Sequence, residues 1–250
     1  PDKPISRPAP ASEPMGFLSD VHGNLPALEA VLDELKRRAV RDVFVAGDLL
    51  LGGAEPLAVW RRLQSLGARC VCGPSDLALA RVDPRTLKPQ DDAERDKVRA
   101  FIETQRALGE LIQKQLGQLP RELRVPLIDG SELLLVHGSP KDPFEPIDHD
   151  LDDEELRAML EDDPADVVIC GGTHVPYARR LEDVQIVNVG SVGAAPGTPG
   201  ANTRSTVRSS STTTSSPCRY QVTVVPGSKV VAASAIAWSM AARSGSISPS

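Results

Sequence analysis

Five short segments of the sequence carry side chains of the types that commonly bind metal ions or phosphate. They are residues 19–24 (SDVHGN), 47–48 (GD), 73–76 (GPSD), 136–138 (VHG) and 171–174 (GGTH). Asp20 and His22 are two residues apart, so an extended strand end points both side chains the same way. Carboxylate oxygens together with imidazole nitrogens suit a borderline divalent ion such as Mn²⁺, Fe²⁺ or Zn²⁺. The segments therefore favour a divalent metal centre.

Apolar runs that alternate with amphipathic stretches predict the elements that must position these segments. Residues 15–19 form a buried run, and apolar residues then repeat at helical spacing from 28 to 35. Residues 43–45 form the next run, and a second amphipathic stretch ends at Gly67. Strands alternating with helices are typical of an α/β domain, whose sites form at the carboxyl ends of the strands. We expect the five segments to meet there.

The same pattern continues through the second half of the chain. Residues 90–118 have a helical period, and 150–163 predict an acidic surface helix. Asp129-Gly130 lies between two apolar runs, which is a strong β-hairpin signal. Residues 167–169 and 185–187 predict two further strands.

The chain divides into three parts by composition. Residues 1–14 are a Pro-rich N-terminal extension, and residues 15–195 form one domain. Residues 196–250 are a Ser/Thr-rich, weakly structured tail, in which 220–233 flank Pro-Gly and predict a hairpin. A diverged tail, a reading-frame error and a deliberate alteration would all produce this change of composition.

The composition argues against several classes of protein. The net charge is -6 and no Lys/Arg-rich block is present, which argues against a large nucleic-acid footprint. No run approaches the ~18 apolar residues of a membrane span. The four cysteines do not form a disulfide framework and fit reduced thiols, so we expect a cytoplasmic protein. These cysteines are Cys70, Cys72, Cys170 and Cys218.

The ordered set of motifs resembles the calcineurin-like metallophosphoesterase family. D-x-H, G-D, G-N-x-D, V-H-G and G-H-x-H follow one another in that family, and the likeness to its small prokaryotic phosphodiesterase branch covers roughly residues 15–195. The resemblance implies an α/β fold, a two-sheet sandwich flanked by helices in four αββα layers. It also implies hydrolysis of a small phosphodiester or phosphomonoester by a metal-activated water, with two ions that share a bridging Asp.

The resemblance assigns a complete set of ligands to the first ion. These four residues are Asp20, His22, Asp48 and His174. Asn24 and Ser75 are assigned contacts with phosphate, and Ser75 stands where some branches place a proton-donating His. No catalytic group other than the metal-activated water is predicted.

The second ion loses two ligands. Pro74 stands where the family has an Asn, and Gly172 stands at the first His of G-H-x-H. Asp48, as the bridging residue, and His137 are the ligands that remain. We therefore expect one tight site, a second site that is weak or empty, and weak activity. The alternative is a decayed, non-catalytic relative that binds metal or phosphate as an interaction or sensing module.

Four features also have ordinary structural interpretations. An Asp-x-His pair before a helix can be a capping arrangement. His149, between two Asp residues, is expected to be a solvated loop residue. Cys70 and Cys72 have the period of two expected of buried thiols in a strand, although a soft-metal pair has the same spacing. Residues 188–191 (NVGS) resemble the closing element of the family or are simply a strand end and turn.

Overall fold

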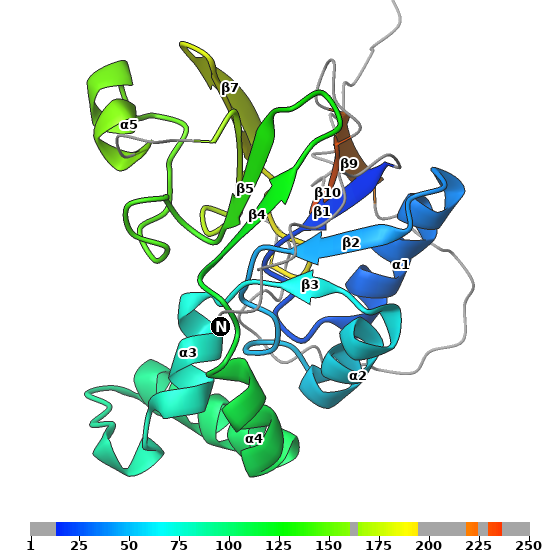
Figure 1. Cartoon of the computed structure of the whole chain (residues 1–250). Helices are drawn as coiled ribbons and strands as arrows, with labels where there is room; N and C mark the ends of the chain where they lie inside the picture. Colours follow the sequence, from blue (N-terminus) through cyan, green and yellow to red (C-terminus); the bar gives the residue numbers. More distant parts are fainter. Residues whose placement is uncertain (1–13, 161–164, 195–218, 225–229, 237–250) are drawn as a thin grey trace, which may run out of the picture.

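Two five-stranded sheets stack face to face, with helices on their outer sides (Figure 1). The chain was examined as a computed structural model, which describes residues 14–160 and 165–194 with side chains and residues 219–224 and 230–236 as backbone. The four-layer αββα architecture predicted above is confirmed. The polar segment 196–217 and most of the Pro-rich extension lie outside the described residues.

The first sheet has the strand order β3-β2-β1-β10-β9. Its strands are β1 (Met15–Leu18), β2 (Asp42–Val45), β3 (Arg69–Cys70), β9 (Arg219–Val224) and β10 (Val230–Ile236). Strands β1, β2 and β3 are parallel, so their carboxyl ends lie at one edge of the sheet. Strand β10 pairs with β1 and forms an antiparallel hairpin with β9. The sheet therefore extends beyond the boundary expected at residue 195.

The second sheet has the strand order β4-β5-β6-β8-β7. Its strands are β4 (Glu122–Pro126), β5 (Glu132–Val136), β6 (Val167–Cys170), β7 (Tyr177–Leu181) and β8 (Val184–Asn188). Strands β4 and β5 form the hairpin predicted at Asp129-Gly130, and Gly130 supplies the positive φ of 90° that the turn needs. Strands β5 and β6 are parallel, so they present a second set of carboxyl ends.

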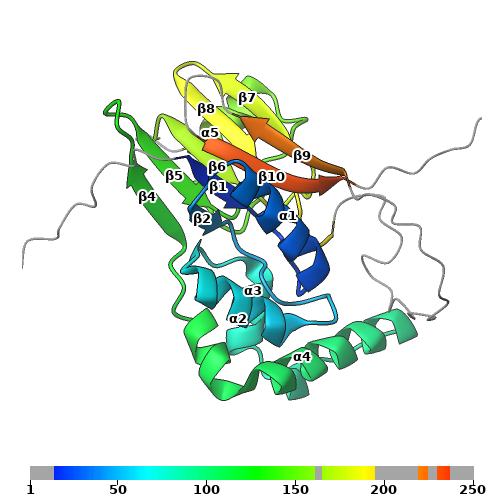
Figure 2. The same cartoon turned by 90° about the vertical axis from the view of Figure 1, so that its right-hand side faces the viewer.

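Helices cover both outer faces. They are α1 (Leu25–Arg37), α2 (Pro56–Leu66), α3 (Pro74–Arg81), α4 (Asp92–Leu116) and α5 (Asp153–Leu160), with a short 3₁₀ turn at Pro84–Thr86. Helix α1 begins after Asn24, whose Oδ1 accepts a hydrogen bond from the N–H of Ala27, and buries one apolar face on the sheet. Helix α2 ends before Gly67 as predicted, and Gly67 has a left-handed conformation. Helix α4 lies across α3 and α2 and is kinked at Gly109 (Figure 2).

Three apolar layers hold these elements together. One lies between the first sheet and helices α1, α2 and α4, and another lies between the second sheet and α5. The middle layer lies between the two sheets, where the rings of Phe17 and Phe44 stack with centroids 4.9 Å apart. This layer fixes the two sets of carboxyl ends relative to each other. Among the described residues, no helix combines the length and the apolar composition needed to cross a bilayer.

We predict that Phe17→Ala lowers the free energy of unfolding by about 3–5 kcal/mol, because it empties space in the middle layer that cannot fully collapse. Chemical denaturation measures this change. The matched control is Ile128→Ala, since Ile128 is 65% exposed at the hairpin tip and its loss should change stability by no more than about 0.5 kcal/mol. Equal effects of the two substitutions would contradict the assignment of this layer.

Candidate metal centre

The side chains singled out in the sequence lie where strands of both sheets end. Asp20 and His22 follow β1, and Asp48 follows β2. From the second sheet, His137 follows β5 and His174 follows β6. Neither sheet alone supplies the whole set, so the centre depends on the packing between them.

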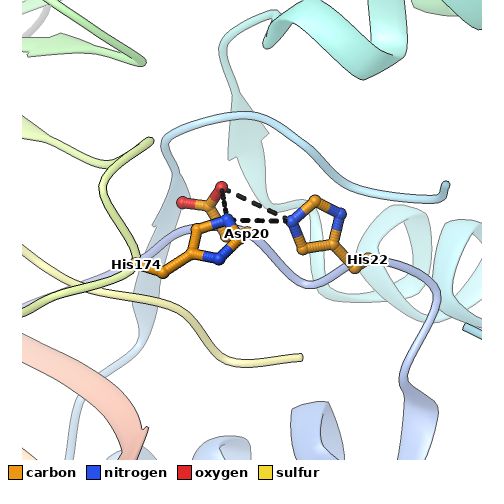
Figure 3. Close-up of side chains that lie close together, drawn as sticks. All are labelled: Asp20, His22 and His174. Atoms are coloured by element: carbon orange, nitrogen blue, oxygen red, sulfur yellow. Dashed lines mark hydrogen bonds and ion pairs between the residues drawn. The ribbon is translucent and has the colours of Figure 1, made fainter. Parts of the chain in front are cut away.

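Three of these side chains converge on one point (Figure 3). His174 Nε2 lies 3.1 Å from Asp20 Oδ1 and 3.2 Å from His22 Nε2. His22 Nε2 lies 3.6 Å from the same oxygen of Asp20. Two imidazole nitrogens and a carboxylate oxygen thus face one another across distances that suit ligands of a shared cation.

Backbone carbonyls fix which nitrogen of two imidazoles faces the centre. His22 Nδ1 lies 2.8 Å from the carbonyl of Leu51, and His137 Nδ1 lies 2.6 Å from that of Ala46. A carbonyl only accepts hydrogen bonds, so each Nδ1 carries the proton and donates it. In the neutral ring, Nε2 then presents a lone pair to the centre, which is the usual arrangement of a metal-binding His.

The centre stabilises negative charge on Asp20. Burial opposes ionisation of this fully buried carboxyl, but hydrogen bonds from His174 and His22 outweigh it and hold the pKa of Asp20 well below its usual range. Burial also disfavours a charged His22, yet its contact with Asp20 raises the pKa of that imidazole. A buried carboxylate of this kind needs a positive partner, either a protonated imidazole or a bound cation.

A second group of possible ligands lies beside the first. It consists of Asp20, Asp48 and His137, and its ligand atoms lie within 4.8 Å of one another. The Oδ2 of Asp48 is 4.0 Å from His137 Nε2. Asp20 belongs to both groups in this structure, whereas Asp48 belongs to the second one. The bridging role expected for Asp48 stays a prediction.

Backbone strain is concentrated at the same residues. Six non-glycine residues among those described have a positive φ, and four of them are the residues assigned to the first ion. Their φ angles are 54° for Asp20, 50° for His22, 53° for Asp48 and 62° for His174. Such conformations cost of order 1–3 kcal/mol each and persist where the surrounding structure imposes them, commonly at functional sites. The strained conformations therefore coincide with the candidate metal ligands.

Hydrogen bonds between the loops after β1 and β2 impose these conformations. The N–H of Asp20 donates to the carbonyl of Gly47, and that of His22 donates to the carbonyl of Asp48, both at 3.0 Å. The N–H of Gly23 continues the series to the carbonyl of Leu49. Each ligand of one loop is therefore tied to the backbone of the other.

Asp76 is a positioning residue to which the sequence analysis gave no role. Its carboxylate accepts hydrogen bonds from the N–H groups of Gly73, Asp48 and Leu49 at 2.8–3.0 Å. Burial and the nearby Asp48 raise the pKa of Asp76 to about 7, and the N–H groups of Gly73 and Leu49 act in the opposite direction. A Cβ on Gly73 would lie 2.3 Å from Asp48 Oδ1, so only glycine allows this approach. The G-x-x-D spacing of residues 73–76 was the signal for this role.

Residues 188–191 form hydrogen bonds with two of the loops that carry the candidate ligands. Asn188 Nδ2 donates to the carbonyl of Gly171 at 2.8 Å, and Ser191 Oγ donates to the carbonyl of Asp20 at 2.9 Å. These two bonds tie the loop after β6 to the loop after β1. The likeness of this segment to the closing element of the family stays a prediction.

The remaining predicted residues have varied surroundings. Both polar groups of Asn24 are engaged, because Oδ1 caps α1 and Nδ2 donates to the carbonyl of Gly193. Ser75 donates from Oγ and N to Asp48 Oδ1. The predicted contacts of these two side chains with phosphate stay predictions. His149 is exposed and pairs with its neighbours Asp148 and Asp150, away from the centre.

The two departures from the family pattern lie beside the second group. Pro74 is the first residue of α3, and Gly172 has a φ of 79°. A Cβ at Gly172 would lie 3.3 Å from His137 Nε2, so this position faces the second group. Neither side chain offers a ligand atom there.

The donor set fits a divalent ion of the Mn²⁺, Fe²⁺ or Zn²⁺ type. It combines imidazole nitrogens with carboxylate oxygens, the ligands that such ions share. The Nδ1 contacts with backbone carbonyls supply the outer support that metal-binding imidazoles need.

Sequence and structure comparisons agree with this centre. The calcineurin-like phosphoesterase superfamily domain matches residues 14–210, which is most of the chain. The chain belongs to this superfamily. Metal-dependent phosphoester hydrolysis is the chemistry that this superfamily suggests. The resemblance noted in the sequence is confirmed.

Individual proteins also resemble this chain. The uncharacterized protein MJ0912 of Methanocaldococcus jannaschii is 25% identical over 180 residues, which are 71% of this chain and 69% of that protein. A metallophosphoesterase structure from Sphaerobacter thermophilus is 26% identical with a TM-score of 0.59, over 74% of this chain and 79% of that one. The hypothetical protein PH1004 of Pyrococcus horikoshii has a TM-score of 0.58 at 23% identity, over 71% and 76% of the two chains, and shares the fold.

We predict that His22→Ala weakens Mn²⁺ binding by at least ~10–100-fold, the loss that even an outer supporting residue causes. Titration calorimetry measures the dissociation constant. His149→Ala is the matched control, because His149 is exposed and its imidazole contacts Asp148, Asp150 and the ring of Tyr177 rather than the centre, and the Mn²⁺ affinity of this variant should equal that of the unaltered chain. Equal losses in both variants would show that the centre is elsewhere.

We predict that Asp76→Asn destabilises the protein by about 1–3 kcal/mol, because an amide cannot replace a carboxylate that accepts three N–H groups. Chemical denaturation of the metal-free protein measures this loss. Asp129→Asn is the control, since that carboxylate accepts bonds from Ser131 in an exposed turn. If the two variants are equally stable, Asp76 does not hold the loop after β2.

Proposed function

We propose that this protein hydrolyses a small phosphodiester or phosphomonoester with one firmly held divalent ion. The observation that carries the proposal is the convergence of Asp20 Oδ1, His22 Nε2 and His174 Nε2 on one point, in residues held in left-handed conformations. Asp48 would complete the ligand set. Superfamily membership supports the reaction class.

The residues of the chain would have distinct roles in such a centre. A bound divalent ion lowers the pKa of water and withdraws charge from a phosphoryl oxygen. Asp20 supplies a negative charge, because the neighbouring His174 and His22 hold its pKa well below the usual range despite its burial. His22 keeps its proton on Nδ1 for the carbonyl of Leu51, which leaves Nε2 free to bind. The strained loops hold these atoms in place before an ion or substrate arrives.

The proposal includes a second site that is weak or empty. Pro74 and Gly172 replace two ligands, and both positions lie beside the group formed by Asp20, Asp48 and His137. A second ion would have to share Asp20 or Asp48 with the first and would gain His137 as its own ligand. Loss of outer supporting residues already costs ~10–100-fold in affinity, so the loss of two direct ligands should cost more.

The substrate and location belong to the same proposal. A net charge of -6 without a basic block supports a small phosphoester substrate over a nucleic acid, and we propose no membrane partner. Three cysteines, Cys70, Cys72 and Cys170, are buried as free thiols. Reduced thiols support a cytoplasmic location.

A second candidate function is a non-catalytic module that binds metal or phosphate. Pro74 and Gly172 favour it, because two ions placed about 3.5–4 Å apart clamp both the attacking and the leaving oxygen, which one ion does less well. The complete first ligand set favours the enzyme. Turnover distinguishes the two candidates.

We predict about one Mn²⁺ per chain after dialysis against a mild chelator, and Mn²⁺-dependent release of nitrophenol from bis(p-nitrophenyl) phosphate or p-nitrophenyl phosphate. Elemental analysis and absorbance measure the two quantities. Asp20→Asn should abolish both, whereas His149→Ala should leave both unchanged. One retained ion without turnover would support the non-catalytic module, and two retained ions would contradict the one-ion proposal.

A further inference from the structure

The hydroxyl and the backbone N–H of Ser75 hold one oxygen of Asp48. Ser75 Oγ donates to Asp48 Oδ1 at 2.7 Å, and Ser75 N donates to the same oxygen at 2.9 Å. The two residues are 27 positions apart, so this is a tertiary contact between the start of α3 and the loop after β2. Asp48 is a candidate metal ligand, which makes the contact functionally relevant.

The two oxygens of Asp48 have different surroundings. A carboxylate oxygen has two lone pairs, and the two donors of Ser75 occupy both of those on Oδ1. Oδ2 lies on the side of His137 Nε2, 4.0 Å away. Asp48 therefore has one oxygen committed to the protein and one left for an ion.

The turn that carries Ser75 is itself rigidly held against Asp48. Asp76 binds the backbone N–H groups of Asp48 and Leu49, and Gly73 packs so closely that a Cβ would lie 2.3 Å from Asp48 Oδ1. Asp48 also has a strained φ of 53°. A carboxylate that only caps helix α3 would not need a left-handed backbone at Asp48. The turn at residues 73–76 is therefore better explained as fixing the orientation of the Asp48 side chain.

We propose that Ser75 is the positioning residue for Asp48, holding Oδ1 and leaving Oδ2 as the oxygen through which Asp48 binds a divalent ion. This inference rests on the proposed metal-dependent function and adds to it the residue that sets the ligand geometry. The proton of the Ser75 hydroxyl is committed to Asp48, so Ser75 is not the proton donor to the leaving group. Its role is exerted through Asp48.

The test is the dissociation constant for Mn²⁺ of Ser75→Ala and Ser75→Thr, measured by titration calorimetry on the full chain. Ala removes the hydroxyl donor and keeps the N–H, so binding should weaken ~10–100-fold, as for other supporting residues. Thr retains the hydroxyl, so it should restore affinity to within about threefold. The visible absorption of the Co²⁺-loaded Ala variant should also differ from that of the unaltered chain, because the coordination changes.

Ser65→Ala is the matched control, because Ser65 Oγ donates to the carbonyl of Arg62 on the exposed side of α2. Its Mn²⁺ affinity should equal that of the unaltered chain. Thermal unfolding of each metal-free variant separates loss of fold from loss of affinity. Unchanged affinity in Ser75→Ala overturns the inference while leaving the proposed function intact. A loss that Thr does not restore also overturns it, and absence of Mn²⁺ binding by the unaltered chain overturns both.

Discussion

The buried carboxylate of Asp20 is the group on which the rest of the centre depends. It lies between the two sheets with no exposed surface, and the Nε2 atoms of two imidazoles from different sheets lie 3.1 and 3.6 Å from its Oδ1. A buried negative charge is unfavourable unless positive partners surround it. The positions of His22 and His174, the tie between the loops after β1 and β2, and the closing bond from Ser191 all serve to keep that charge in place.

The middle layer of the sandwich gives this arrangement its precision. Ligands from the first sheet meet ligands from the second, so the stacking of Phe17 on Phe44 and its neighbours sets the distances within the centre. Close-packed interiors resist small displacements. The strained φ angles of the four ligands persist because both sheets and their loops restrain them.

The proposed difference between the two metal sites rests on the local sequence. All four residues that the family pattern assigns to the first ion are present, whereas Pro74 and Gly172 stand where the pattern assigns ligands to the second ion. Ser75 further commits one oxygen of Asp48 to helix α3. These features support the proposed single-ion centre, and they are local changes that leave the αββα framework intact.

The sequence by itself determined the fold class, the course of α1 and α2, the hairpin at Asp129-Gly130 and the order of the ligand motifs, because periodicity, turn residues and motif spacing are local properties. It did not predict α3 or β7, which are short and have weak patterns. It also placed a domain boundary at residue 195, before β10 pairs with β1. Only the tertiary structure decided that Asp20 is shared by both groups of candidate ligands and that Ser75 and Asp76 hold Asp48 and its loop. Those contacts join residues that are 27 or more positions apart in the sequence. The distances between the candidate ligands depend on how the two sheets pack, and no local sequence pattern encodes that packing.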